Sequence, residues 1–181
     1  VILSGAGVVI GDAINECKAL AEKLDAPVCN GYQHNDSFPG SHPLAVGPLG
    51  YNGSKAAMQL ISKADVVLAL GTRLNPFSTL PGYGIDYWPK NANIIQVDMN
   101  PDRIGLTKKV TVGIAGDAKQ VAKQIFDKLS SNAGDSGRED RKNLIHQTKS
   151  AWLQTLTSLD HEDDDPGTVW NKEARERDKD R

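Results

Sequence analysis

The feature that most constrains the fold is a run of five apolar residues, Val66-Val-Leu-Ala-Leu70, with no polar interruption. A strand of continuous apolar character is typical of a parallel sheet that is covered on both faces. Similar short apolar runs occur at Val1–Leu3, Pro27–Cys29, Ile94–Val97 and Val110–Ile114. We expect these runs to be strands of one sheet.

Segments with the apolar spacing of helices separate or follow these strands, at about 12–24, 54–63, 117–129 and 138–159. Asp117 is a good helix-capping residue, and Gln120 occupies the capping-box position three residues later. Strands that alternate with helices predict an α/β fold with a doubly wound, mainly parallel, Rossmann-like sheet.

The composition changes after Ser130, where Ser-Asn-Ala-Gly-Asp-Ser-Gly is typical of a hinge. From Asp160 onward the chain is strongly charged and reads as a linker. We therefore predict a central domain over residues 1–130, and a helix followed by a charged interdomain linker over residues 131–181. The chain begins inside a strand without an initiator Met, so we expect it to be a piece of a longer protein.

The overall composition excludes several classes of partner. A net charge of −2 gives no attraction to nucleic acid or anionic lipid, and no apolar run approaches membrane-spanning length. The two cysteines, Cys17 and Cys29, lack metal or redox spacing and are expected to be small buried hydrophobes. No secretory leader opens the chain, which favours the cytoplasm.

Several candidate ligand-binding residues follow strands, where α/β sheets bind their ligands. Gly5 and Gly7 follow the first strand, but their G-x-G-x-x-x-G spacing is one residue longer than the dinucleotide fingerprint. The guanidinium group of Arg73 suits the binding of a phosphate or carboxylate. An ion pair with Asp86 at the protein surface is an equally good interpretation. Asp98 suits ribose hydroxyls, with a turn cap as the simpler alternative.

No catalytic or metal-binding set stands out in the sequence. His34, His42 and His161 show no metal spacing, and the acidic run 163–165 is better explained as solvated linker. No Ser/His/Asp or Cys/His arrangement is visible. From the residues alone, the chain is an α/β domain with a nucleotide-sized cleft and no complete catalytic apparatus.

An ordered set of motifs then resembles one enzyme family. The set comprises the Gly-Ala-Gly turn at residue 5, Phe38-Pro-Gly-Ser-His-Pro43, Gly47-Pro-Leu-Gly-Tyr-Asn-Gly53, Ala64-Asp-Val-Val-Leu-Ala-Leu-Gly-Thr-Arg73 and Ile94-Ile-Gln-Val-Asp98. It resembles the central domain of thiamine-diphosphate enzymes of the acetolactate synthase type. Within them, Gly31-Tyr-Gln-His-Asn-Asp36 and Asn75–Pro89 resemble the sulfoacetaldehyde acetyltransferase family.

The resemblance implies a full-length parent that uses thiamine diphosphate and Mg²⁺ to convert sulfoacetaldehyde and phosphate into acetyl phosphate and sulfite. In this superfamily the cofactor lies between an N-terminal and a C-terminal domain, which are the implied partners and which this sequence lacks. The parent is expected to be a homodimer or homotetramer, and the fragment alone to be inactive. The alternatives are a pyruvate-using acetolactate synthase-like enzyme or a non-catalytic nucleotide-binding module.

Central domains of this superfamily bind FAD, bind ADP or are empty. By resemblance, Gly5, Gly7, Tyr51, Asn52, Gly53, Arg73 and Asp98 would line such a pocket. Two departures argue against FAD: Tyr51-Asn52 replaces the Met-His of FAD-binding members, and Leu74–Ser78 replaces their acidic, Arg-bearing stretch. The pocket is therefore expected to be vestigial or to hold another nucleotide.

Overall fold

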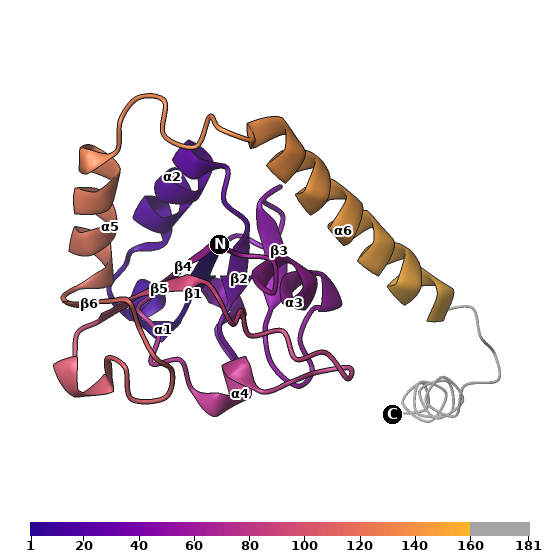
Figure 1. The fold of residues 1–181 in the computed structure, drawn as a ribbon, viewed down its shortest axis with the longest axis horizontal. Helices are drawn as coiled ribbons and strands as arrows, with labels where there is room; N and C mark the ends of the chain where they lie inside the picture. Colours follow the sequence, from indigo (N-terminus) through magenta and orange to yellow (C-terminus); the bar gives the residue numbers. More distant parts are fainter. Residues whose placement is uncertain (160–181) are drawn as a thin grey trace, which may run out of the picture.

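The computed structural model describes residues 1–159 and shows one parallel six-stranded sheet (Figure 1). The strand order is β3-β2-β1-β4-β5-β6, which is the order of the doubly wound nucleotide-binding folds. All five strand pairings are parallel, which confirms the predicted fold class. The strands are β1 (Ile2–Ser4), β2 (Val28–Asn30), β3 (Ala45–Pro48), β4 (Val66–Leu70), β5 (Asn93–Asp98) and β6 (Val112–Ala115).

Two groups of helices flank the sheet, and helices pack within each group (Figure 1). The first group is α1 (Ala6–Ile10), α2 (Ile14–Leu24) and α5 (Ala118–Lys128), and the second is α3 (Lys55–Ile61) and α6 (Arg138–Leu159). Asp117 caps α5 by accepting the Gln120 amide at 3.0 Å, as its sequence predicts. The central strands β1 and β4 are almost wholly buried between the groups.

Helix α6 is fastened to the main body by charged side chains of its first turns. Arg141 donates to the carbonyl oxygens of Leu24 and Asp25 at 3.0 and 3.2 Å, where α2 ends and leaves carbonyls without helical partners. Arg138 forms an ion pair of 2.9 Å with the Asp25 carboxylate. Ile145 is buried in the core, so the first half of α6 belongs to the folded body.

The structure adds short elements that the sequence pattern did not indicate. Strand β3 lies within the first long loop, and its Gly47 and Pro48 explain why the sequence reads as a turn there. It pairs only with β2 and forms the sheet edge, where a proline is tolerated. A four-residue helix, α4 (Pro76–Thr79), lies within the second long loop, with Asn75 as its cap.

The remaining sequence predictions concern burial and the chain's end. Cys17 and Cys29 are fully buried and free, as expected. Within residues 1–159, no helix is long and apolar enough to cross a membrane. The predicted charged linker from Asp160 onward lies outside the described residues.

Candidate functional site

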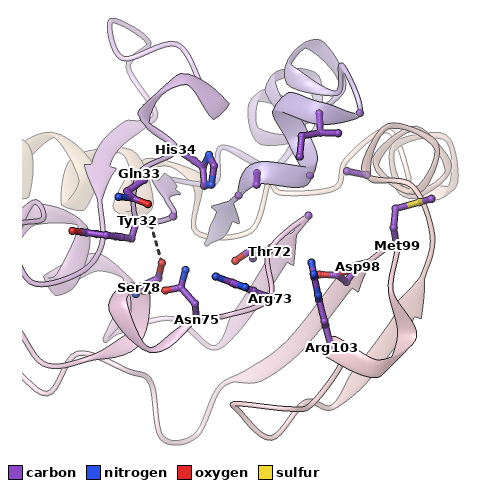
Figure 2. A pocket seen from close by; sticks show the side chains of 18 of the residues that line it. Tyr32, Gln33, His34, Thr72, Arg73, Asn75, Ser78, Asp98, Met99 and Arg103 are labelled. Carbon is purple, nitrogen blue, oxygen red and sulfur yellow. Dashed lines mark hydrogen bonds between the residues drawn. The ribbon is translucent and has the colours of Figure 1, made fainter.

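A cavity of about 470 Å³ opens at the carboxyl ends of β1, β4 and β5, where an α/β sheet is expected to bind a ligand. Figure 2 shows Arg73 and Arg103 on neighbouring strand ends, with Gln33 and His34 across the space from them. Its other lining residues are Gly5, Ala6, Gly7, Ile10, Gly11, Gly31, Tyr32, Gly71, Thr72, Asn75, Ser78, Asp98, Met99, Gly116, Asp117 and Ala118.

Glycines form the floor of the cavity because two backbone turns touch there. The Gly7 amide donates to the Gly71 carbonyl at 2.8 Å, and a Cβ on Gly7 would lie 2.7 Å from the Gly71 Cα. Gly71 itself has φ of +60°, a conformation that favours glycine. A side chain at either position would therefore push the two turns apart.

Two arginines line the cavity, together with the carboxylates of Asp98 and Asp117. Arg73 follows β4, and Arg103 lies in the 3-10 turn η2 (Pro101–Arg103) after β5. Neither forms an ion pair with any carboxylate within residues 1–159; Asp86 pairs with Lys90 instead, at 3.4 Å. The surface-pair alternative for Arg73 is thus not what the structure shows, and both guanidinium groups are available to an anion.

The buried side chain of Gln96 joins the two arginine-bearing segments. Its Nε2 donates to the carbonyl oxygens of Thr72 at 3.1 Å and Arg103 at 3.2 Å, and its Oε1 accepts the Gly105 amide at 2.9 Å. Gln96 is only 1% exposed, so these three bonds satisfy an amide that would be costly to bury alone. Gln96 therefore bridges the two turns that carry the cations.

Asp98 lies in the cavity wall and also caps a turn. Its Oδ1 accepts the Asn100 amide at 2.8 Å, so the simpler turn-cap role that the sequence suggests is present. Its Oδ2 accepts no hydrogen bond from the described part of the chain. One carboxylate oxygen therefore remains for a ligand hydroxyl.

On the β2 and β3 side, aromatic side chains pack around α4 at the carboxyl edge of the sheet. The rings of Tyr32 and Phe77 stack with centroids 5.5 Å apart, and the Tyr32 amide donates to Ser78 Oγ at 2.8 Å. Tyr87, 1% exposed, donates to the Ser78 carbonyl at 2.9 Å. Burial raises the pKa of the Tyr87 phenol to about 12. These contacts hold α4 against the first loop.

Three of the predicted pocket residues, Tyr51, Asn52 and Gly53, do not line the cavity. Tyr51 is 74% exposed, and the Gly53 carbonyl accepts the Tyr83 hydroxyl at 3.2 Å. The reason is the position of α4, whose Ser78 faces the cavity while the Phe77 carbonyl presses on Gly50. The structure thus brings together Gly5, Gly7, Arg73 and Asp98, and separates the other three from them.

Sequence reasoning missed most of the polar lining, above all Arg103, Thr72, Asn75 and Ser78. Arg103 had a usable signal, because it follows a strand that ends in a candidate ligand residue. Asn75 and Ser78 carry no such signal, since their place depends on α4.

The other reactive groups of the described residues form neither a metal site nor a nucleophilic thiol. No group of three or more His, Cys, Asp or Glu residues in 1–159 is placed to hold a metal ion. Burial raises the pKa of the Cys17 and Cys29 thiols to about 12, so neither is a thiolate near neutral pH.

Comparison with known proteins gives a consistent family. The model of the thiamine pyrophosphate enzyme central domain matches residues 1–125. A solved structure assigned as a thiamin diphosphate-dependent enzyme from Mycobacterium smegmatis is similar with a TM-score of 0.58 and 26% identity, covering 72% of this chain and 24% of that one.

Among curated proteins, a probable sulfoacetaldehyde acetyltransferase of Rhizobium meliloti is 80% identical over the whole chain. A sulfoacetaldehyde acetyltransferase of Roseovarius nubinhibens is 74% identical over 97% of it. A probable acetolactate synthase large subunit of Methanocaldococcus jannaschii is 39% identical over 88%. The chain spans only 31%, 29% and 24% of these relatives, respectively.

Proposed function

Because the chain belongs to the family of thiamine pyrophosphate enzyme central domains, we propose that it is the central domain of a thiamine-diphosphate-dependent sulfoacetaldehyde acetyltransferase. One observation carries this proposal. Identity is 80% and 74% to relatives with that name, against 39% to an acetolactate synthase subunit. The chain covers about three-tenths of the sulfoacetaldehyde acetyltransferases, so their reaction is proposed for a full-length parent.

In the proposed reaction the carbon–sulfur bond of sulfoacetaldehyde breaks, sulfite leaves, and the acetyl group passes to phosphate as acetyl phosphate. When bound, thiamine diphosphate supplies the nucleophilic carbon and the electron sink for this chemistry. Residues 1–159 offer no ligand cluster for the Mg²⁺ that accompanies the diphosphate. We therefore assign the cofactor and metal to N- and C-terminal domains of the parent, and no catalytic residue to this chain.

This assignment makes the domain a scaffold between two cofactor-binding domains. We further propose that the parent is cytoplasmic and assembles as a homodimer or homotetramer. The pyruvate-using alternative remains the competitor, because the acetolactate synthase relative also matches 88% of the chain.

The test is release of sulfite by the full-length protein with sulfoacetaldehyde, phosphate, thiamine diphosphate and Mg²⁺, with the 181-residue chain assayed in parallel. We expect phosphate-dependent sulfite from the parent and none from the chain. Acetolactate formation from pyruvate, without sulfite release, would assign the parent to the alternative reaction.

A second proposal concerns the cavity, which we propose binds a nucleotide through its phosphates. Its volume of about 470 Å³ lies in the range of small-molecule sites. Gly7 and Gly71 line the cavity without a side chain where the two turns touch, and Arg73 and Arg103 present two cations without ion-pair partners in residues 1–159. The Asp98 carboxylate lines the cavity and uses only Oδ1 in the Asn100 turn, which supports a contact of Oδ2 with a ribose hydroxyl.

We expect ADP rather than FAD, since α4 and the aromatic side chains beside it fill the neighbouring half of the sheet edge. Calorimetric titration of the 181-residue chain with ADP, and separately with FAD, tests this. Saturable one-to-one binding of ADP and no binding of FAD is the expected result. FAD binding, or no binding of either, would reject the proposed ligand.

A further inference from the structure

A second cavity of about 710 Å³ lies between helix α6 and the rest of the domain. One wall is a face of α6, and the other is formed by the end of α2 and by the segment that leads into β3. We call this cavity the α6 groove; its lining includes Leu44, Ile145, His146, Lys149, Ser150 and Leu153. It shares no residue with the cavity at the strand ends, so it is a separate place for a ligand.

The surface of the α6 groove is mostly apolar. Leu44 and Ile145 contribute nearly buried side chains, at 8% and 4% exposure, whereas Leu153 is 64% exposed. A concave, mainly apolar surface of this volume, with a few polar groups, is the usual form of a site for a small organic molecule.

Contacts between the two walls hold the groove in shape. The Lys149 ammonium group donates to the Pro43 carbonyl at 2.8 Å, which ties the middle of α6 to the segment before β3. At the start of the helix, Arg141 donates to the carbonyls that end α2. The groove is therefore formed by the protein's own contacts and needs no ligand to open it.

Three hydrogen-bond donors point to the kind of ligand. His146, Lys149 and Ser150 are three and four residues apart on α6, so they lie on one face of the helix. Within residues 1–159 none of them pairs with a carboxylate. Lys149 donates only to the carbonyls of His42 and Pro43, so one of its three N–H groups remains for a ligand.

The acidic residues of the groove already have partners. Glu22 pairs with His42 at 3.1 Å, and Asp25 pairs with Arg138 at 2.9 Å. Lys149 is thus a cation among apolar side chains without a counter-charge in residues 1–159. Burial lowers the pKa of its ammonium group, because the charged form has lost part of its solvation. A bound anion would replace that solvation.

We propose that the α6 groove binds an amphiphilic monocarboxylate. The carboxylate contacts Lys149 and Ser150, and the hydrocarbon part lies against Ile145 and the neighbouring apolar side chains. A single negative charge matches the single ammonium group that lacks a counter-charge, and the apolar walls require an organic chain rather than an inorganic anion. The site depends neither on the proposed activity nor on the nucleotide cavity.

The test is amide NMR of the isotopically labelled 181-residue chain during titration with octanoate. We expect saturable shifts at residues 42–44 and 145–153. Octanol, which has the same chain length without the charge, should bind about tenfold more weakly, because it lacks the charge-assisted hydrogen bonds. Octylammonium should not bind. Octylammonium binding as tight as that of octanoate would reject the proposal, because the paired acidic residues would then govern the groove.

Lys149→Met should weaken octanoate binding by about tenfold or more and leave octanol binding unchanged, so octanol reports whether the groove of this variant is intact. Lys128→Met is the control, because Lys128 is an exposed helical lysine outside the groove. Equal octanoate affinity of the two variants would overturn the assignment of the carboxylate to Lys149.

Two further outcomes would reject the site. Shifts at the groove residues that follow protein concentration without octanoate would assign the groove to a second copy of the chain. In the full-length protein, saturating octanoate should slow amide hydrogen exchange in residues 142–153. Unchanged exchange there would show that the intact protein does not offer this site. Neither measurement involves sulfite release or ADP, so failure here leaves the proposed function standing.

Discussion

Both halves of the carboxyl edge of the sheet are made of the ends of parallel strands, but the residues that follow the strands differ. On the β1, β4 and β5 side, glycine turns and two arginines leave a cavity of about 470 Å³. On the β2 and β3 side, Tyr32, which also lines the cavity, stacks on Phe77, and Tyr87 bonds to Ser78 of α4. The loop residues therefore decide how much of this edge stays open to a ligand.

The two halves also differ in the contacts that hold their loops in place. The open half is held by backbone contacts and by Gln96, whose amide lies beneath the two cationic turns. The filled half is held by stacked rings and by hydroxyl groups such as that of Ser78. The changes predicted below remove these contacts or the two cations, and only changes in the open half should affect nucleotide binding.

The largest effect is expected at the glycine contact of the open half. Gly71→Ala would add a Cβ 2.8 Å from the Gly7 backbone at φ of +60°, so strain and overpacking together should cost about 3–4 kcal/mol of unfolding free energy. Gly40→Ala is the control, because its Cβ would meet nothing within 4 Å. Urea denaturation measures both. A difference under about 0.5 kcal/mol between the variants would contradict the close contact.

Removing both cations should abolish most nucleotide affinity. The double variant Arg73→Ala, Arg103→Ala is expected to weaken ADP binding by about 100-fold or more, since charge-assisted bonds contribute about 1.5–3 kcal/mol each. Lys109→Ala removes an exposed cation outside the cavity and should change the affinity less than about threefold. Calorimetry on the 181-residue chain gives all three affinities, and equal losses in the two variants would point to non-specific attraction.

Gln96→Met tests the bridge between the arginine-bearing turns. The change keeps the side-chain length but leaves the Thr72 and Arg103 carbonyls without their donor, so it should cost about 2 kcal/mol of stability. The ADP affinity should fall about tenfold, because the two arginines lose their fixed spacing. Chemical denaturation and ADP titration measure the two effects. Lost stability with full affinity would show that the bridge does not position the cations.

The smallest effect belongs to Tyr87 in the filled half. Tyr87→Phe removes the bond to the Ser78 carbonyl and should cost about 1 kcal/mol without changing the affinity for ADP. Burial raises the phenol pKa to about 12, above its usual value of 10. The unfolded chain therefore loses this proton first, and the stability that Tyr87 contributes is complete below pH 10 and lost as the pH rises to about 12.

Unfolding free energies of the unmodified 181-residue chain and of its Tyr87→Phe variant, measured at pH 9 and above pH 11, test that dependence. The two buried thiols also titrate in this range, but they are present in both proteins and cancel in the difference. The gap between the proteins should shrink with rising pH. A gap that stays constant would contradict the burial of the phenol.

Much of the fold was predictable from periodicity alone. The run Val66–Leu70 identified the central strand, the apolar spacing of 138–159 gave the bounds of α6, and Asp117 identified the start of α5. Strand β3 was missed because Gly47 and Pro48 mimic a turn, and its pairing depends on the neighbouring strand rather than on its own residues.

The site was predictable only where it follows strands directly. Gly5, Gly7, Arg73 and Asp98 come immediately after or at the ends of strands, and the topology brings them together. Tyr51 to Gly53 were assigned by resemblance, and no local pattern announces that α4 separates them from the cavity. Gln96 was also invisible, because a buried amide in a strand is revealed only by its partners.

The most direct test of the difference between the two halves is a titration of the isotopically labelled 181-residue chain with ADP, followed by amide NMR. We predict saturable shifts at Gly5, Gly7, Gly71, Arg73 and Arg103, with none at Tyr51, Asn52 or Gly53. Shifts centred on residues 51–53 and Phe77, with the glycine turns unaffected, would contradict the account, because the filled half would then be the ligand site.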